Sequence, residues 1–335
     1  PKMLNKTQEE ITAKWKSLDT EHPLVSIKCL AFNQEKYIAQ TLDGFLMQET
    51  DFPFEIIVHD DASTDKTQDI LREYQAKYPL ILKPVYQKEN QYSKRDGSVT
   101  RAANAPLKGK YIAECEGDDY WTDPQKLQRQ ADFLEQNPDY IAVGHNVRIV
   151  DDEGNPMKKD HPIYRKWFDT YTSMEDRDYT LQDFEKGVMF GQTCTRMYRN
   201  IINPLPKAIE EKYFAMDYTN GDVAMSLLCF CLGKIRCSSL VGADHRKSIS
   251  NDSWTSKTFK KNMTRRDILS LIAQEKFANS FNIFPDFTDQ QYRHVRRSFT
   301  IFKQSKSWKD FSIFIGNLRI IKHKINFLKR LFKLG

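Results

Sequence analysis

Short apolar segments that end in polar residues recur through the first half of this sequence. They are rich in β-branched and aromatic residues, as buried strands are, and the clearest are "LVSIKCLAF" (24–32), "FEIIVHD" (54–60) and "KGKYIAECE" (108–116). The first two are each followed by apolar residues at helical spacing. Strands that alternate with helices in this way form a mostly parallel sheet with helices on its faces. The sequence therefore predicts an α/β fold.

Acidic residues stand directly after two of these predicted strands. Asp60 and Asp61 end the segment 54–60 or follow it, and Asp118 and Asp119 follow the segment 108–116. In a parallel sheet, ligands bind beyond the carboxyl ends of the strands. The sequence therefore predicts a ligand site at the edge where these carboxylates gather.

Asp61 is the harder member of the first pair to explain. Helix capping accounts for Ser63, Thr64 and Asp65, but it leaves no backbone donor reserved for Asp61. An ionised carboxylate only accepts hydrogen bonds, so it suits the imide N–H of uracil or a ribose hydroxyl. Recognition of a nucleotide and helix capping both stay open from these residues.

The adjacent carboxylates of Asp118 and Asp119 repel each other unless something separates their charges. They form a hard, oxygen-rich site that suits Mg²⁺ or Mn²⁺, and such ions take further ligands from the phosphates of a substrate. The alternative is a solvated turn, because Gly and Asp are common in turns. The tripeptide alone does not decide between a metal site and a turn.

Four segments of the sequence share a pattern with one protein family. They are "VSIKCLAFNQEKYI", "EIIVHDDASTDKT", "GKYIAECEGDDYWTDPQKLQRQADFLEQNP" and "GDVAMSLLCFCLGKI". Together they resemble the family 2 glycosyltransferases of the GT-A fold, a Rossmann-like, mostly parallel sheet flanked by helices. The likeness is closest to the bacterial cell-surface polysaccharide branch, which shares the GDDYW form of the metal motif. It covers about residues 24–150 and 185–250.

The resemblance implies an inverting, metal-dependent hexosyltransferase. Such an enzyme moves a sugar from a nucleotide diphosphate, most often UDP, to a hydroxyl of a glycan or lipid-linked acceptor in bacterial surface polysaccharide or glycoprotein glycan synthesis. The implied cofactor is Mn²⁺ or Mg²⁺, and a UDP-sugar is the donor substrate. The alternative that we keep is a nucleotide-sugar-binding pseudoenzyme or a membrane-surface scaffold for other transferases.

The resemblance also assigns the nucleotide-binding residues. It places Ala31, Phe32 and Asn33 where the end of the first strand meets the nucleotide, and it matches Asp61 to the aspartate that holds the base. Arg95 and Arg101 are candidates for the diphosphate, because a guanidinium grips phosphate in a fork. Each arginine alone also fits a solvated helix charge.

The metal and the catalytic base are assigned in the same way. Asp119 matches the direct metal ligand, and Asp118 faces the ribose or a metal-bound water. Asp222, in "NGDVAM", matches the catalytic base, and single displacement needs such a carboxylate to take the acceptor's proton. Many relatives carry a Tyr-Arg-x-His stretch after this helix, whereas this chain has "ADHRKSISNDSW" with His245 and Arg246 displaced in register. His245 is a third candidate metal ligand, with a structural role as the alternative.

We expect the resemblance to mark out the domains. The expected order is an N-terminal helical leader at 1–22, a GT-A catalytic domain at 23–255, with a nucleotide-sugar half at about 23–122 and an acceptor half at about 123–255, a helical region at 256–302 and a basic amphipathic tail at 303–335. The acceptor half includes His145, for which packing in the core is an equal alternative.

The last 33 residues are strongly basic. From Lys303 onward there are nine lysines and arginines against a single acid, Asp310, while the whole chain carries a net charge of +6. Aromatic and aliphatic residues recur every three or four positions from 308 to 335, as in a helix that lies on an anionic membrane surface. The alternative is a terminal helix packed on the protein body or on a partner subunit.

Composition excludes several other classes. No apolar run approaches the roughly 20 residues of a membrane span, and no long apolar segment follows the basic residues at the start. We therefore expect a cytoplasmic protein, peripheral on the inner face of the plasma membrane if the tail binds there. A neutral body with a basic tail argues against nucleic-acid binding, and a homo-oligomer is left open. No Gly-x-Gly-x-x-Gly follows a strand, which excludes a dinucleotide-dependent oxidoreductase.

Overall fold

The computed structural model describes residues 6–94, 96–160, 172–202, 205–216, 219–248, 264–321 and 326–327. Contacts within the chain divide it into two compact units. The first unit comprises Pro1–Tyr179, Phe190–Pro206 and Leu232–Lys247, and the second comprises Thr180–Met189, Lys207–Cys231 and Ser248–Gly335. The domain boundaries expected from the sequence stay a prediction.

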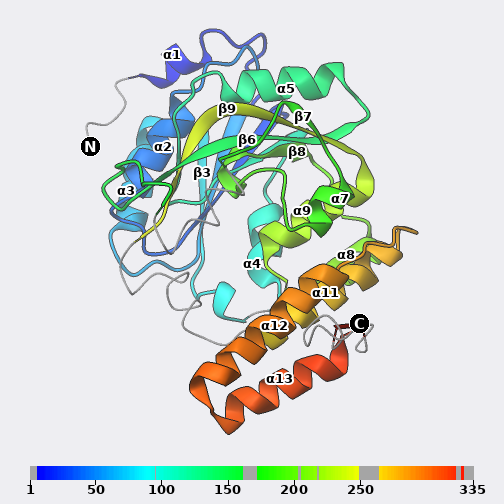
Figure 1. The fold of residues 1–335 in the computed structure, drawn as a ribbon. Helices are drawn as coiled ribbons and strands as arrows, with labels where there is room; N and C mark the ends of the chain where they lie inside the picture. The colour runs from blue at the N-terminus through cyan, green and yellow to red at the C-terminus, as the bar shows by residue number, and fades with distance from the viewer. Residues whose placement is uncertain are drawn as a thin grey trace. The chain divides into compact units, whose positions relative to one another are not determined.

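Four parallel strands form one half of the sheet in the first unit (Figure 1). They stand in the order β3 (Leu82–Tyr86), β2 (Phe54–Asp60), β1 (Val25–Ala31) and β4 (Tyr111–Glu114). Ile27 of β1 pairs with Ile56 on one side and Ala113 on the other. Every residue of β2 is buried, which explains the apolar run Ile56–Val58 at its centre. The α/β prediction is confirmed.

The other half of the sheet is mixed rather than parallel. Its strands are β8 (Met197–Arg199), β6 (Tyr140–Val150), β9 (Lys234–Arg246), β5 (Tyr120–Trp121) and β7 (Arg177–Tyr179). β8 runs antiparallel to β4 and β6, whereas β6 and β9 are parallel. β5 and β7 both pair antiparallel with β9. Strands of two or three residues carry too little periodicity to be found in a sequence.

Helices of the first unit position the loops at the sheet's edge. They are α1 (Gln8–Thr12), α2 (Ile38–Leu46), α3 (Thr67–Lys77), α4 (Ser98–Asn104) and α5 (Lys126–Gln136), with 3₁₀ turns η1 (Tyr92–Lys94) and η2 (Thr193–Thr195). α2 turns Ile38, Leu42 and Phe45 into the core. A Cβ on Gly44 would lie 2.9 Å from the backbone nitrogen of Trp121, so only glycine lets α2 pack this closely on β5.

Lys126 of α5 is a lysine buried inside the first unit. Its side chain is 1% exposed, its Nζ donates to Gln130 Oε1 over 2.8 Å, and the same atom lies 4.3 Å from the centre of the Trp121 ring. Burial lowers the pKa of Lys126 to about 7, because the charged ammonium loses its hydration. Between about pH 7 and the ordinary lysine pKa of about 10.4, Lys126 therefore carries its proton in the unfolded chain and not in the folded chain.

We expect the stability of this unit to rise with pH over that window, by up to about 1.4 kcal/mol per pH unit. Methionine carries no proton in either state, so Lys126→Met removes this dependence. The free energy of unfolding of the variant relative to the wild type should therefore fall as the pH is raised from about 7 to about 9. Denaturant unfolding at both pH values measures the difference, and an equal difference at both would contradict the lowered pKa.

The described part of the second unit is helical. Its helices are α7 (Leu181–Glu185), α8 (Lys207–Phe214), α9 (Gly221–Leu232), α11 (Thr264–Asn279), α12 (Thr288–Ser305) and α13 (Trp308–Ile320). Figure 1 shows α11, α12 and α13 side by side. They share an apolar cluster made of Ile268, Tyr292, Val295, Phe314, Ile321 and Phe327. A buried hydrogen bond from Asn317 Nδ2 to Thr264 Oγ1, 2.8 Å long, also joins α13 to α11.

The described part of the basic tail packs within the second unit. Phe314 and Ile321 belong to its apolar cluster, and Phe311, Ile315 and Leu318 pack against that cluster. These contacts favour the packed alternative for 308–321. Lys322, Lys324 and 328–335 lie outside the described residues, and contact of the tail with an anionic membrane stays a prediction. None of the helices that the structure describes is long and apolar enough to cross a bilayer.

Candidate active site

The end of β1 lies between the two acidic loops that the sequence singled out. The backbone N–H of Asp61, after β2, donates to the carbonyl of Ala31 over 2.9 Å. On the other side, the N–H of Gly117, after β4, donates to the carbonyl of Leu30 over 2.9 Å. Because β2, β1 and β4 are parallel neighbours, their carboxyl ends bring Asp61 and the Gly117–Asp119 loop to one edge of the sheet.

Asp61 is buried, and both of its carboxylate oxygens accept backbone hydrogen bonds. Oδ1 accepts from the N–H of Gln91 over 2.7 Å, and Oδ2 accepts from the N–H of Tyr92 over 2.9 Å. The expectation that no backbone donor serves Asp61 was therefore wrong, since the donors come from a loop thirty residues later. Each carboxylate oxygen can accept a second hydrogen bond, for example from a nucleotide base. The contact with a base stays a prediction.

Asn33 ties the loop after β1 to the loop after β2. Its backbone is left-handed, with φ 53°, a conformation that Asn tolerates better than most residues. Its N–H donates to Ser63 Oγ over 2.9 Å, and its Oδ1 accepts from the N–H of Thr64 over 2.8 Å. Ala31 is buried at the end of β1, whereas Phe32 is 46% exposed and open to a ligand. Their role at the nucleotide stays a prediction.

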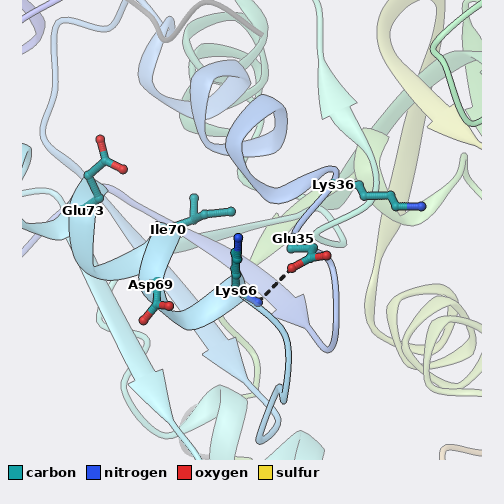
Figure 2. Close-up of a pocket in the computed structure, with 6 residues that line it drawn as sticks. All are labelled: Glu35, Lys36, Lys66, Asp69, Ile70 and Glu73. Atoms are coloured by element: carbon teal, nitrogen blue, oxygen red, sulfur yellow. Dashed lines mark hydrogen bonds between the residues drawn. The ribbon is translucent and has the colours of Figure 1, made fainter.

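Figure 2 shows a hollow beside these loops that includes none of the predicted site residues. Its lining residues are Glu35, Lys36, Lys66, Asp69, Ile70 and Glu73. The N–H of Lys66 donates to Glu35 Oε2 across it, over 3.0 Å. Its charges are of both signs and lie on α3 and the loop before α2. We assign this hollow no ligand.

The Gly117–Asp119 loop is fixed by α2. Thr41 Oγ1 lies 2.7 Å from the carbonyl oxygen of Asp119 and 3.0 Å from that of Gly117, so the hydroxyl bridges the two. Asp119 N–H donates to the carbonyl of Glu116 over 3.1 Å, which closes the turn. These contacts hold Asp119 with its side chain turned inward and fully buried, while Asp118 stays partly exposed.

His245 meets Asp119, although 126 residues separate them in the sequence. The antiparallel pair of β5 and β9 sets Tyr120 opposite Asp244 and so brings the end of β9 beside the acidic loop. His245 Nδ1 lies 2.7 Å from Asp119 Oδ2, and the N–H of Arg246 donates to Asp119 Oδ1 over 2.8 Å. The register displacement inferred from the sequence therefore does not keep His245 away from Asp119.

Arg246 is a neighbour of the acidic pair to which the sequence gave no role. Its guanidinium lies 4.3 Å from the centre of the Tyr37 ring and 5.2 Å from that of Tyr120. It donates to Gln40 Oε1 over 2.8 Å and to the carbonyl oxygen of Asp118. No short motif links these positions, because they come from α2, β5 and β9. The positive charge of the buried Arg246 side chain offsets part of the negative charge of the Gly117–Asp119 loop.

The electrostatics of the acidic pair fit a divalent cation. Burial and the neighbouring Asp119 carboxylate raise the pKa of Asp118 to about 7. Burial would also raise the pKa of Asp119, but the His245 ring and the Arg246 N–H outweigh it and hold that pKa below its usual value. Ligand atoms of Glu116, Asp118 and Asp119 all lie within 4.8 Å of one another. Hard oxygens at such spacing suit Mg²⁺ or Mn²⁺.

Cys194 extends this arrangement on the His245 side. Ligand atoms of Asp119, Cys194 and His245 also lie within 4.8 Å of one another. Burial raises the pKa of the Cys194 thiol well above its usual value, and the Asp119 carboxylate adds to the effect. A neutral thiol is a poor ligand for a hard cation, so the carboxylates and the imidazole are the better donor set.

In the part of the chain that the structure describes, no hydrogen bond or ion pair joins the remaining predicted residues to Asp119. Asp222 is the second residue of α9 in the second unit, and its Oδ1 accepts from the N–H of Val223 over 2.9 Å. Its role as the base stays a prediction. Arg101 is exposed on α4 and donates to the carbonyl of Asp96 over 2.8 Å. Arg95 lies outside the described residues. His145 is buried with its Nδ1 2.8 Å from the Asn146 carbonyl, which favours packing.

Solved structures share this fold. Residues 1–349 of S. aureus TarS, in complex with UDP-GlcNAc, are similar with a TM-score of 0.58 and 17% identity, over 92% of this chain and 81% of that chain. The mannosyltransferase PcManGT from Pyrobaculum calidifontis, in complex with GDP-Man and Mn²⁺, gives a TM-score of 0.50 and 13% identity, over 96% and 91% of the two chains. The fold is therefore that of the GT-A glycosyltransferases.

Sequence comparison then identifies the family. Residues 26–203, just over half of the chain, match Glycosyl transferase family 2, so the chain belongs to this family. Uncharacterized proteins of Mycobacterium tuberculosis are 44% identical over 130 residues, which span 39% of this chain and 37% of theirs. The putative teichuronic acid biosynthesis glycosyltransferase TuaG of Bacillus subtilis is 33% identical over 140 residues, spanning 41% and 52% of the two chains. The chain thus matches about a third to a half of these relatives' length.

Proposed function

We propose that this protein is an inverting, metal-dependent glycosyltransferase that takes a hexose from a nucleotide diphosphate, with UDP as the nucleotide. The observation that carries the proposal is the buried Asp119 carboxylate, held by His245 and Arg246 beside the Asp118 carboxylate. The complexes of TarS with UDP-GlcNAc and of PcManGT with GDP-Man and Mn²⁺ support a sugar nucleotide and a divalent cation.

In this proposal Asp119 holds the cation, with Asp118 and His245 as further ligands. A divalent cation, when bound, offsets the negative charge that develops on the leaving diphosphate. Asp61 binds the base, and Ala31, Phe32 and Asn33 line the nucleotide. In the proposal, Asp118 contacts the ribose as well as the cation. This assignment of roles relies on the position of these residues at one edge of the sheet.

Asp222 takes the proton from the acceptor hydroxyl as that hydroxyl attacks the anomeric carbon. A carboxylate is suited to this step because it can be ionised at neutral pH and accept a proton in the transition state. Arg95 and Arg101 bind the diphosphate in the same proposal. The acceptor is a hydroxyl of a bacterial surface glycan or of a lipid-linked glycan, and the match to TuaG supports a role in polysaccharide synthesis.

The deciding experiment is a calorimetric titration of UDP and UDP-sugars with and without Mn²⁺. We expect UDP binding that requires the cation, because Asp119 and Asp118 repel the diphosphate until a cation lies between them. The same titration with GDP is the control for base recognition by Asp61. UDP binding of equal strength after removal of divalent cations would contradict metal dependence, and preference for GDP would contradict UDP as donor nucleotide.

We further propose that the basic tail brings the enzyme to an anionic membrane, where a lipid-linked acceptor would be presented. Its excess of lysine and arginine over acidic residues is the feature that supports this. Phe314 of α13 is buried in the second unit, whereas Trp308 at the start of α13 is 82% exposed, so the contact would combine Trp308 with a mainly electrostatic attraction. Co-sedimentation with anionic and with neutral vesicles tests it, and equal recovery with both kinds at low salt would contradict it.

A further inference from the structure

The Arg246 side chain is buried beside the acidic pair and is held between two aromatic rings. It is 6% exposed, and its guanidinium carbon lies 4.3 Å from the centre of the Tyr37 ring and 5.2 Å from that of the Tyr120 ring. Aromatic rings at such distances attract a cation through their negative faces. The Tyr37 ring is itself tethered, because its hydroxyl donates to Asp152 Oδ1 over 3.1 Å. The fold of the first unit therefore fixes the place of the guanidinium.

The guanidinium bridges α2 and the acidic loop. Nη2 donates to Gln40 Oε1 over 2.8 Å, and Nη1 donates to the carbonyl oxygen of Asp118. The backbone N–H of Arg246 donates to Asp119 Oδ1 over 2.8 Å. Arg246 thus contacts both members of the acidic pair, through the main chain of Asp118 and the side chain of Asp119.

Together with Thr41, Arg246 occupies all three carbonyls of the Gly117–Asp119 loop. Thr41 Oγ1 lies within 3.0 Å of the first and third carbonyl oxygens, and Arg246 donates to the second. The residue that binds the guanidinium on α2, Gln40, directly precedes Thr41. With its carbonyls held in this way, the loop cannot turn to move its two carboxylates apart, although their charges repel each other.

We propose that Arg246 is a positioning residue of the acidic loop, which keeps the Asp118 and Asp119 carboxylates together at the site of the cation. It acts through the main chain of the loop and not as a ligand, because a guanidinium has no acceptor atom to offer a metal ion. The proposal rests on the proposed function, because it takes the acidic loop as the site of the cation.

The charge of Arg246 and its position have opposite effects on the affinity for a cation. Its positive charge repels a divalent ion, so removal of the charge alone would tighten binding. Its hold on the Asp118 carbonyl keeps the ligands in place, so removal of that contact would weaken binding. We expect the second effect to be the larger, because the carboxylates of Glu116, Asp118 and Asp119 must all stay within reach of one ion.

Two substitutions separate charge from position. Arg246→Met removes the guanidinium and keeps an unbranched side chain, whereas Arg246→Lys keeps the charge without the planar fork that reaches two acceptors. We expect both to weaken Mn²⁺ binding, titrated in the presence of UDP, by about 10- to 100-fold. In a transfer assay the KM for Mn²⁺ should rise while kcat at saturating Mn²⁺ stays near that of the wild type, because every ligand remains. Wild-type affinity in Arg246→Lys, or tighter binding in Arg246→Met, would overturn the proposal.

Amide hydrogen exchange of the metal-free protein measures the loop without the cation. We expect the segment 115–121 to exchange faster in both Arg246 variants, while the buried strand β2 exchanges as in the wild type and so shows that the variants are folded. Unchanged exchange of 115–121 would overturn the proposal. If the wild-type protein binds no Mn²⁺ while both variants exchange faster at 115–121, Arg246 holds the loop, and it is the proposed function that fails.

Arg199→Met is the matched control. Arg199 also donates to backbone carbonyls, those of Tyr140 and Leu134, over 2.7 Å each, and its guanidinium lies 5.5 Å from the centre of the Tyr111 ring. Its loss should lower stability, because these carbonyls lose their donor. It should leave both the exchange of 115–121 and the affinity for Mn²⁺ unchanged.

Discussion

Asp119→Asn is expected to abolish metal-dependent UDP binding and to lower the rate of transfer by on the order of 10³-fold, since a catalytic cation supplies several kcal/mol. The substitution keeps the size of the side chain but removes its charge. It also sets an amide N–H₂ or a neutral oxygen against His245 Nδ1, where the carboxylate now lies at 2.7 Å. Calorimetry of UDP with Mn²⁺ and a transfer assay with a UDP-sugar measure the two effects.

Glu55→Gln is the matched control for Asp119→Asn. Glu55 is another buried carboxylate of the first unit, but it lies near the start of β2, at the opposite end of the strand from Asp60. It is paired with Lys83 over 3.0 Å and accepts from Ser26 Oγ over 2.6 Å. Its loss should therefore cost stability without affecting metal-dependent UDP binding. Intact UDP binding in Asp119→Asn with Mn²⁺ would show that the metal ligand lies elsewhere.

Asp222→Asn is expected to lower transfer by about 10²- to 10⁴-fold, the contribution typical of a general base. UDP binding should stay unchanged, because the proposed role of Asp222 is to accept the acceptor's proton and not to bind the nucleotide. Asp222 lies in the first turn of α9, where loss of its charge should cost only about 0.3–1 kcal/mol. A transfer assay with a hydroxyl acceptor, together with UDP calorimetry, separates the chemical step from donor binding.

Asp289→Asn is the control for that variant. Asp289 is likewise an acid in the first turn of a helix of the second unit, α12. If the loss in Asp222→Asn came from a weakened helix N-terminus, the Asp289 variant would show a comparable change in thermal stability, whereas its transfer rate should stay at the wild-type level. Full transfer activity in Asp222→Asn would show that Asp222 is not the catalytic base.

Local sequence was enough to predict the strands in the half of the sheet that binds the nucleotide in our proposal. β1 and β2 are buried on both faces, so each is rich in apolar and β-branched residues, a pattern that a sequence displays directly. Asp61 and Asp119 follow strands, and strands that run parallel must end at one edge, so their position was predictable as well. The mixed half was not predictable, because β5, β7 and β8 are only two or three residues long.

Contacts between distant segments were beyond the reach of the sequence. The partners of Asp61 come from Gln91 and Tyr92, and the pairing of β5 with β9 decides that His245 reaches Asp119. Nothing in the segment around Gln192, which follows the turn at Gly191 with its φ of +94°, marks it as a neighbour of His245. The packing of Phe314 on α11 and α12 likewise favours one of two uses of an amphipathic helix that have the same spacing.

The sequence by itself determined the fold class, the family and the carboxylates at the strand ends, because each of these depends on neighbouring residues and on the direction of single strands. Only the tertiary structure decided which groups surround those carboxylates. Short paired strands and a turn that requires glycine bring together residues that are 53 to 127 positions apart in the chain. Such contacts gain their free energy from the assembled sheet rather than from local preference.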